Sequence, residues 1–164
     1  MYTREIQTLK IKIIALGKIK EKFLKDGIDE FLKRLVPYTS LEILELSPIE
    51  IKDENLVSKV LDEEAEKILS LIKDDSFVIT LEIKGKQLSS EEFAEKINDI
   101  TKSGISELVF VIGSSCGLSP KVSQRANFKL SFSKMTFLHQ FSRLILIEQI
   151  YRAFKILNNE KYHK

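Results

Sequence analysis

The chain has 164 residues, of which 43% are hydrophobic, and its 26 basic and 24 acidic side chains leave a net charge of +2. A chain of this size can bury one hydrophobic core, so a single domain is expected. No apolar stretch approaches the roughly 18 residues that a membrane-spanning helix needs, and the start of the chain lacks the apolar segment of a signal peptide, so we expect a cytosolic protein and no membrane partner.

The sequence offers few ligands for a metal ion. One cysteine, Cys116, and two histidines, His139 and His163, are too few for a convincing zinc site. A magnesium ion held by carboxylates is left open, although no acidic cluster points to one. We therefore assign no metal site.

Short β-branched runs alternate with segments of helical period along the chain. The runs predict strands at 9–16, 41–46, 77–83, 108–112 and 128–132. The segments between and after them predict helices at 22–35, 56–72, 91–101, 120–126 and 138–157. This alternation predicts an α/β fold with a mostly parallel sheet that carries helices on both faces.

Local signals agree with these helix boundaries. Ser89 and Glu92 have the spacing of a capping box, and Ser119 precedes Pro120 as a cap residue precedes a first-turn proline. Gly104 stands where the third helix should end. The last helix is apolar around more than one face, so part of it would be exposed to water unless a second subunit covered it, and we expect a homodimer.

The charge is unevenly distributed. The segment 121–164 contains nine Lys or Arg and two Glu, a net charge of +7, whereas the first 120 residues have 17 basic and 22 acidic side chains, a net charge of −5. A basic end suits attraction to a phosphate backbone, but a solvated helix face would explain it equally well.

The fourth strand runs directly into the sequence Gly-Ser-Ser-Cys-Gly-Leu-Ser-Pro, residues 113–120. This segment matches neither the P-loop nor the glycine pattern of dinucleotide-binding folds. Ligands of open parallel sheets bind at the carboxyl ends of the strands, which places a candidate site after the third and fourth strands. From the glycine spacing alone, a plain tight turn is as good an interpretation.

Three further segments are characteristic in their sequence and in their order along the chain. They are Ile11 to Lys18, Ser131 to Phe137, and Glu148 to Phe154, the last followed by Tyr-His-Lys at 162–164. Together with 113–120 they resemble the small bacterial SPOUT methyltransferases of the ribosomal RNA large subunit methyltransferase H family. The resemblance covers residues 10–164 and leaves 1–9 as an N-terminal extension. It implies an α/β-knot fold, in which the C-terminal part of the chain forms a deep trefoil knot.

The resemblance also implies that S-adenosylmethionine binds among three loops. Carried over by position, the cofactor-binding residues are Leu81, Gly113, Phe132, Ser133, Lys134, Met135, Thr136 and Phe137. Glycine would let the backbone reach the cofactor, the apolar side chains would wall the adenine, and the hydroxyls would donate hydrogen bonds. Without the resemblance, Phe132, Met135 and Phe137 are interpreted as core residues.

The implied reaction is methylation of N3 of a pseudouridine in 23S ribosomal RNA, at position 1915 in the loop of helix 69, in the large subunit or the assembled ribosome. Candidate catalytic residues are His139, Arg152, Tyr162 and His163. A histidine bonded to backbone at a helix start is the alternative for His139, and an ion pair with Glu148 is the alternative for Arg152. Rival functions are methylation of transfer RNA, or ribosome binding without catalysis.

Three positions depart from the family pattern. Ser114 stands where a second glycine is usual, Cys116 where a polar or acidic residue is usual, and Leu138 where proline is usual. Ser114 adds a side chain to a loop that should lie against the cofactor, and Leu138 removes a restraint on φ before the last helix. These changes bear on cofactor affinity more than on the fold.

Overall fold

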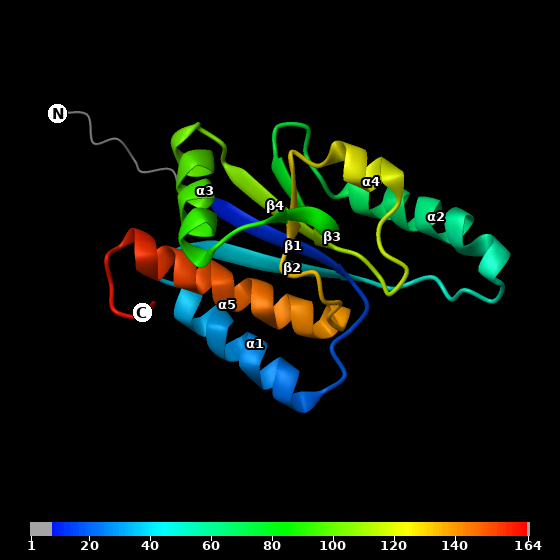
Figure 1. Ribbon diagram of the computed structural model, residues 1–164, viewed down its shortest axis with the longest axis horizontal. Helices are drawn as coiled ribbons and strands as arrows, with labels where there is room; N and C mark the ends of the chain where they lie inside the picture. The colour runs from blue at the N-terminus through cyan, green and yellow to red at the C-terminus, as the bar shows by residue number, and fades with distance from the viewer. Residues whose placement is uncertain (1–7, 164) are drawn as a thin grey trace.

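The computed structural model describes residues 8–163 and forms a five-stranded sheet with helices on both sides (Figure 1). The strands are β1 Lys10–Leu16, β2 Ser40–Leu46, β3 Phe77–Gln87, β4 Glu107–Ile112 and β5 Phe128–Ser131. The helices are α1 Lys22–Leu35, α2 Val57–Ser70, α3 Ser90–Lys102, α4 Pro120–Arg125 and α5 His139–Leu157, with a 3-10 turn, η1 Glu54–Leu56, before α2. The predicted α/β class and all ten elements are confirmed to within a few residues.

All strand pairs of the sheet are parallel, in the order β2-β1-β4-β3-β5. The central strand β4 pairs with β1 on one side and with β3 on the other, and every residue of it is buried. A strand buried on both faces needs apolar side chains on both, which is why β4 is an unbroken apolar run after Glu107. The carboxyl ends of β3, β4 and β5 therefore meet at one edge of the sheet.

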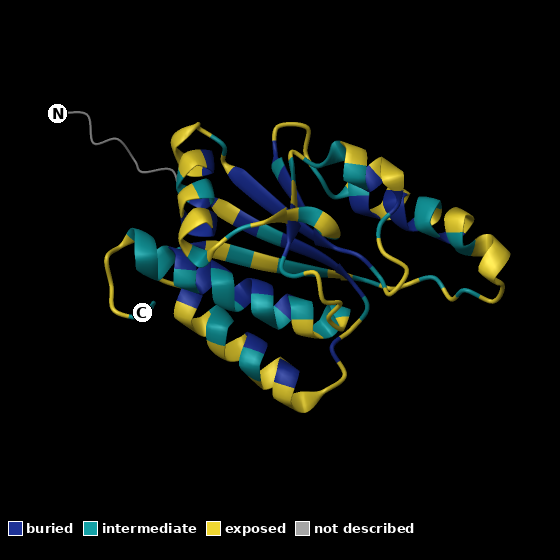
Figure 2. Cartoon of the chain, viewed as in Figure 1, coloured by how far each residue is buried: buried dark blue, intermediate teal, exposed yellow. Residues whose placement is uncertain are grey.

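The two faces of the sheet have separate hydrophobic cores. Helices α1, α3 and α5 cover one face, with Ile13 and Phe110 at the centre of a large cluster. Helices α2 and α4 cover the other face over a smaller cluster that includes Val109 and Val111. Figure 2 shows that β1 and β4 form the buried centre of the sheet, whereas the edge strand β2 is only partly covered. Alternate residues of one strand thus serve opposite cores.

The capping residues and the terminal glycine predicted from the sequence are confirmed at α3 and α4. Ser89 and Glu92 form a complete capping box at the start of α3. Ser119 caps α4 and is followed by Pro120 at the first turn. Gly104 follows α3 with a φ of +87°, a conformation that glycine adopts without strain. These local choices fix where the two helices begin and where α3 ends.

Strand β3 is longer than its apolar run predicted, and the extension is irregular. Leu81 and Lys86 both pair with Leu130 of β5, so residues 82–85 bulge away from the ladder. A Cβ on Gly85 would lie 2.7 Å from the carbonyl oxygen of Lys129, so only glycine permits this close crossing. Bulges of this kind redirect side chains next to functional sites. The trefoil knot in the last third of the chain stays a prediction.

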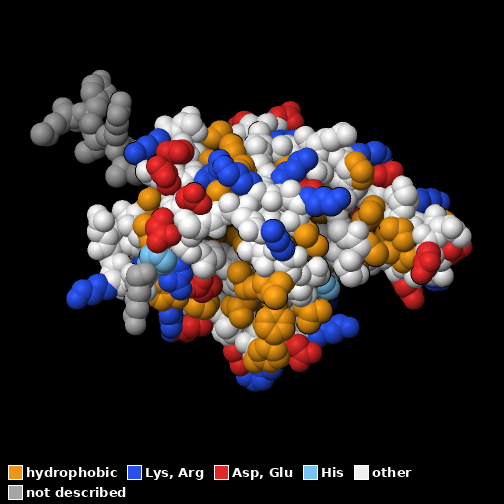
Figure 3. Space-filling model, in the orientation of Figure 1, with side chains coloured by type: hydrophobic (Ala, Val, Ile, Leu, Met, Phe, Trp, Pro, Cys, Tyr) orange, Lys and Arg blue, Asp and Glu red, His pale blue; other side chains and the backbone are white. Residues whose placement is uncertain are grey.

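Helix α5 is enclosed by α1 and α3 along most of its length, and Figure 1 shows α1 and α5 side by side. This packing explains its apolar composition without a second subunit, except at its start, where Phe141 is exposed beside Phe23 of α1. Figure 3 shows an apolar patch on this face. The homodimer stays a prediction. Burial of this patch would remove exposed apolar surface from water, so it is the surface on which we expect a second subunit.

Residues 1–7 of the expected N-terminal extension lie outside the described residues, as does Lys164 at the chain end. Leu9, at the end of that extension, is buried, and its carbonyl oxygen accepts a hydrogen bond of 2.6 Å from Thr39. Among the described residues, no helix is both long enough and apolar enough to cross a membrane.

The buried position of β4 leads to a stability prediction for Val109→Ala. Val109 is fully buried, so the loss of two methyl groups and the resulting cavity should lower the free energy of unfolding by about 2 kcal/mol. The matched variant Val36→Ala alters a side chain that is 75% exposed and should change it by less than about 0.5 kcal/mol. Urea titration measures both, and equal losses would contradict the assigned core.

Candidate functional site

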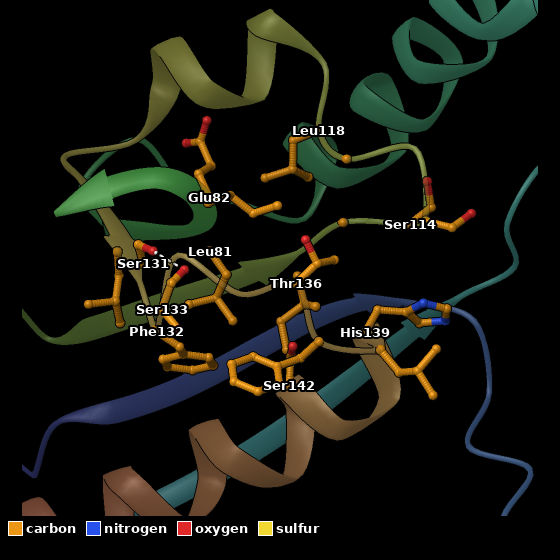
Figure 4. A pocket seen from close by; sticks show the side chains of 18 of the residues that line it. Leu81, Glu82, Ser114, Leu118, Ser131, Phe132, Ser133, Thr136, His139 and Ser142 are labelled. Atoms are coloured by element: carbon orange, nitrogen blue, oxygen red, sulfur yellow. Dashed lines mark hydrogen bonds between the residues drawn. The ribbon is translucent and has the colours of Figure 1, made fainter. Parts of the chain in front are cut away.

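A cleft of about 820 Å³ opens at the sheet edge where β3, β4 and β5 end. Its walls are the bulge after Leu81, the loop from Gly113 to Leu118 and the segment from Leu130 to His139. Figure 4 shows Leu81, Phe132 and Thr136 gathered around the hollow, with His139 at the end nearest the start of α5. The cleft lies where the sequence predicted a site, at the carboxyl ends of parallel strands.

The loop after β4 is both a tight turn and a wall of the cleft. Its glycines therefore fit both interpretations offered by the sequence, a plain turn and part of a site. The Gly117 N–H donates to the carbonyl oxygen of Ser114 at 2.9 Å, and Gly117 has a φ of +86°. A Cβ on Gly113 would lie 2.5 Å from the Gly117 carbonyl oxygen, so the turn closes only over a glycine. Bare backbone is thereby presented to the cleft.

The segment before α5 forms the opposite wall. Ser131 donates to the Ser133 carbonyl oxygen at 3.0 Å, and the Ser133 hydroxyl accepts from the Met135 N–H at 3.0 Å. Met135 is 74% exposed and Phe137 is 41% exposed, so the interpretation of these two as core residues is wrong. Phe132 is half-buried and packs against the main core while also lining the cleft.

Lys134 differs from the other seven residues predicted to bind a cofactor. Those seven line the cleft, namely Leu81, Gly113, Phe132, Ser133, Met135, Thr136 and Phe137. The side chain of Lys134 is exposed and is not among the lining residues. The spacing of the segment places its apolar and hydroxyl groups inward and this cation toward solvent.

His139 is the one candidate catalytic residue in the cleft. Burial, followed by the nearby Arg143 guanidinium, lowers its pKa from the ordinary value of 6.5. The imidazole ring of His139 forms no hydrogen bond with another described residue, so the alternative of a ring bonded to backbone is not what the structure contains. A neutral imidazole at the cleft wall can accept a proton.

The other three candidates form a separate cluster near the chain end. Arg152 pairs with Glu148 at 2.5 Å, as expected for their spacing, and its guanidinium lies 4.7 Å from the centre of the Tyr162 ring. The Tyr162 hydroxyl donates to Glu148 at 3.0 Å, and burial together with Glu148 raises the pKa of Tyr162. Tyr162 is therefore held against α5.

His163 completes this cluster. Its Nδ1 lies 3.1 Å from an Arg152 nitrogen, and its Nε2 lies 2.5 Å from a carboxylate oxygen of Glu91 on α3. Because arginine can only donate, Nδ1 must accept and Nε2 must carry the hydrogen. Arg152, Tyr162 and His163 thus meet, but His139 lies 13 residues before Arg152 on the same helix, a separation of about 20 Å.

Most of the C-terminal positive charge is engaged within the chain. Lys121, Arg125, Arg143, Arg152 and Lys155 each bond to carboxylates or carbonyl oxygens. Arg143, for example, is buried and pairs with Glu45. These five basic residues therefore have partners within the chain, and the choice between a phosphate-binding end and a solvated face stays open.

The three departures from the family pattern are accommodated locally. Leu138 has a φ of −56°, within the range that proline would impose, so the backbone enters α5 as it would with proline. The Ser114 hydroxyl accepts from the Cys116 N–H at 3.4 Å and lies 3.5 Å from Glu64. Cys116 is exposed on the turn.

The sequence analysis missed the bulge residues Glu82 and Lys84, which also line the cleft. Glu82 accepts hydrogen bonds from Thr80 at 2.5 Å and from Ser123 at 2.9 Å, and it points toward α4 in Figure 4. The glycine at 85, directly after a strand-like run, was the available signal for this bulge. Within residues 8–163 no group of three or more acidic, His or Cys side chains could hold a metal ion.

The structure thus defines a parallel α/β protein with a glycine-walled cleft at the carboxyl ends of its strands. Residues 9–163 match the family model described as "Predicted SPOUT methyltransferase", and the chain belongs to this methyltransferase family.

Individual relatives within this family are similar to the chain over nearly its whole length. A protein of Clostridioides difficile is 55% identical over 160 residues, and one of Carboxydothermus hydrogenoformans is 54% identical over 160 residues. Both are named "Ribosomal RNA large subunit methyltransferase H", and each alignment covers 95% of this chain and all of the relative. A protein of Methanococcus vannielii is 56% identical over 163 residues with the same coverage.

The environment of His139 gives a prediction for its titration. In the folded protein its pKa should lie below 6.5, because burial and Arg143 both disfavour the charged ring. NMR titration of the two histidines measures this, and His163→Gln assigns the signals. A His139 pKa at or above 6.5 would contradict the buried position at the cleft wall.

Proposed function

We propose that this chain is an S-adenosylmethionine-dependent methyltransferase that methylates N3 of a pseudouridine in 23S ribosomal RNA, the target implied at position 1915. The observation that carries the proposal is the convergence on one cleft of seven predicted cofactor-binding residues, in a chain of the SPOUT family: Leu81, Gly113, Phe132, Ser133, Met135, Thr136 and Phe137. The relatives' names supply the RNA class. A ribosomal substrate implies a cytoplasmic enzyme that acts on the large subunit or the assembled ribosome.

The cleft suits the proposed cofactor in size and chemistry. Its volume of about 820 Å³ falls in the range of small-molecule sites. Leu81 and Phe132 provide apolar surface for an adenine, the hydroxyls of Ser133 and Thr136 can bond to polar groups, and Gly113 leaves backbone accessible. When bound, the cofactor supplies an activated methyl group on its sulfonium.

The protein's part in the reaction is to orient the base and manage its proton. Pseudouridine N3 carries a proton at neutral pH, so the nitrogen becomes a nucleophile as that proton leaves. His139 is neutral near pH 7 and lies at the cleft wall, where it can accept a proton at a ring nitrogen. Arg152 beside Tyr162 and His163 offers a cation and an aromatic face that suit an unstacked base.

A shared active site follows from the separation within one protomer. His139 and the cluster of Arg152, Tyr162 and His163 lie about 20 Å apart along α5, too far to act on one base. A homodimer can bring the cluster of one subunit to the cleft of the other. The exposed apolar patch at Phe23 and Phe141 supports such a dimer.

Exposed lysines near the cleft support an RNA partner. Lys84 and Lys86 lie on the extension of β3, Lys129 on β5 and Lys134 on the following segment, and all four are exposed. None of them forms an ion pair with another residue in the described part of the chain. Unpaired ammonium groups around the mouth of a cleft attract a phosphate backbone. Figure 3 shows basic side chains gathered above the apolar patch.

The proposal predicts methyl transfer to ribosomes that lack the modification. Purified protein with radiolabelled S-adenosylmethionine should label 23S RNA in ribosomes or large subunits from a deletion strain, at one pseudouridine N3 located by mass spectrometry. Gly113→Ala should lower this activity at least tenfold, because its Cβ would lie 2.5 Å from the Gly117 carbonyl oxygen and displace the loop. The control is Gln124→Ala on α4, an exposed residue that does not line the cleft.

Three results would contradict the proposal. Labelling of transfer RNA in place of ribosomal RNA would show that transfer RNA is the substrate. Absence of cofactor binding by calorimetry would favour a ribosome-binding protein without catalysis. An unchanged N3 methylation pattern in the deletion strain would remove the ribosomal RNA assignment.

The shared site predicts complementation between two inactive variants. His139→Ala and Tyr162→Ala should each lose most activity alone. After mixing under conditions that exchange subunits, activity should return to about a quarter of the wild-type rate, because half of the dimers are mixed and each mixed dimer has one complete site. No recovery, with exchange verified by mass spectrometry, would place each site within one subunit.

A further inference from the structure

Three serines between residues 114 and 123 bond to carboxylates in or next to the cleft. Ser114 lies 3.5 Å from Glu64, Ser119 donates to Asp62 at 3.0 Å, and Ser123 donates to Glu82 at 2.9 Å. Glu82 lines the cleft, whereas Asp62 and Glu64 belong to α2, which packs with α4 over the smaller core and has no residue in the cleft lining. The loop that bears Gly113 is thus held from behind at both of its ends.

We propose that Asp62 and Glu64 of α2 are positioning residues of the cofactor site, which hold the loop between β4 and α4 in its binding conformation. This inference rests on the proposed function, because it assigns the loop to S-adenosylmethionine. Neither residue touches the cleft, so their effect reaches the cofactor through Ser119 and Ser114.

The Asp62 contact fixes the far end of the loop. Ser119 is 2% exposed, and its hydroxyl accepts from the Lys121 N–H at 3.2 Å while it donates to Asp62. The same carboxylate lies 3.7 Å from the Lys121 ammonium group. A hydroxyl has one proton to donate, so capping of α4 and attachment to α2 use different sides of the same oxygen. Movement of the loop end would break both contacts.

The Glu64 contact fixes the near end. Glu64 is 2% exposed, an uncommon position for a carboxyl group, and its second oxygen has no partner among the described residues. Burial raises the pKa of Glu64, and the Ser114 contact and Lys67 oppose that shift. A buried polar atom without a partner costs stability, so the fold gains little from Glu64 itself. Its contact with Ser114, one residue after Gly113, indicates that Glu64 serves to hold the loop.

The other acidic residues of α2 provide a contrast. Glu63 and Glu66 are exposed and have no contact with the loop. The attachment of α2 to the sheet is made by apolar side chains, among them Ala65 and Ile68 of the smaller core. Removal of the Asp62 carboxylate should therefore leave the fold in place and release the loop.

The test measures S-adenosylmethionine affinity, turnover and thermal stability in the full chain. Asp62→Ala and Glu64→Ala should each raise the calorimetric Kd about tenfold, while kcat at saturating cofactor changes less than about twofold and the Tm stays close to that of the control Glu66→Ala. Asp62→Asn keeps an oxygen that can accept from Ser119, so it should restore most of the affinity.

A double-mutant cycle separates positioning from a general loss of structure. If Asp62 acts through Ser119, the double variant Asp62→Ala, Ser119→Ala should bind no more weakly than the worse of its two single variants. Independent, multiplying effects would overturn the inference, as would an unchanged Kd in Asp62→Ala and Glu64→Ala, or a raised Kd accompanied by a lowered Tm in both. If the wild-type chain itself fails to bind S-adenosylmethionine, the proposed function fails instead.

Discussion

The parallel pairing of β4 with its neighbours is the constraint on which the rest of the structure depends. Because β3, β4 and β5 run in the same direction, their carboxyl ends meet at one sheet edge and their following segments converge there. Each segment then meets a local requirement: a bulge after Leu81, a glycine turn at Gly113, and a hydroxyl-braced segment after Ser131. The cleft is a consequence of topology, and these residues determine its shape.

The two helical layers have different relations to this cleft. On one face, α5 carries His139 at its start and the cluster of Arg152 and Tyr162 about 20 Å further on, so one helix connects the cleft with that cluster. On the other face, α2 reaches the back of the cleft only through carboxylates at Asp62 and Glu64. The first layer carries the candidate catalytic side chains, and the second is bonded to the loop after β4 that walls the cleft.

The fold was predictable from the sequence because each strand is a short apolar run and each helix has a clear period or cap, as Ser89 and Ser119 illustrate. The cleft's apolar and glycine residues followed from family resemblance. Contacts across many residues could not be predicted: Glu82 bonds to Ser123, and Glu64 lies under Ser114, 50 positions away. Periodicity describes neighbours on one element, whereas these pairs depend on how α2, α4 and β3 pack.

The unusual residues of the loops illustrate how a motif can change while its geometry persists. Leu138 stands where the resemblance expects a proline, and its φ of −56° lies within the range that proline allows. Ser114 replaces a glycine at a position where the backbone does not need a positive φ, since only Gly117 of this turn has one. Its added hydroxyl bonds to the turn and approaches Glu64. Substitution is tolerated where the surrounding structure, and not the residue's own backbone freedom, determines the conformation.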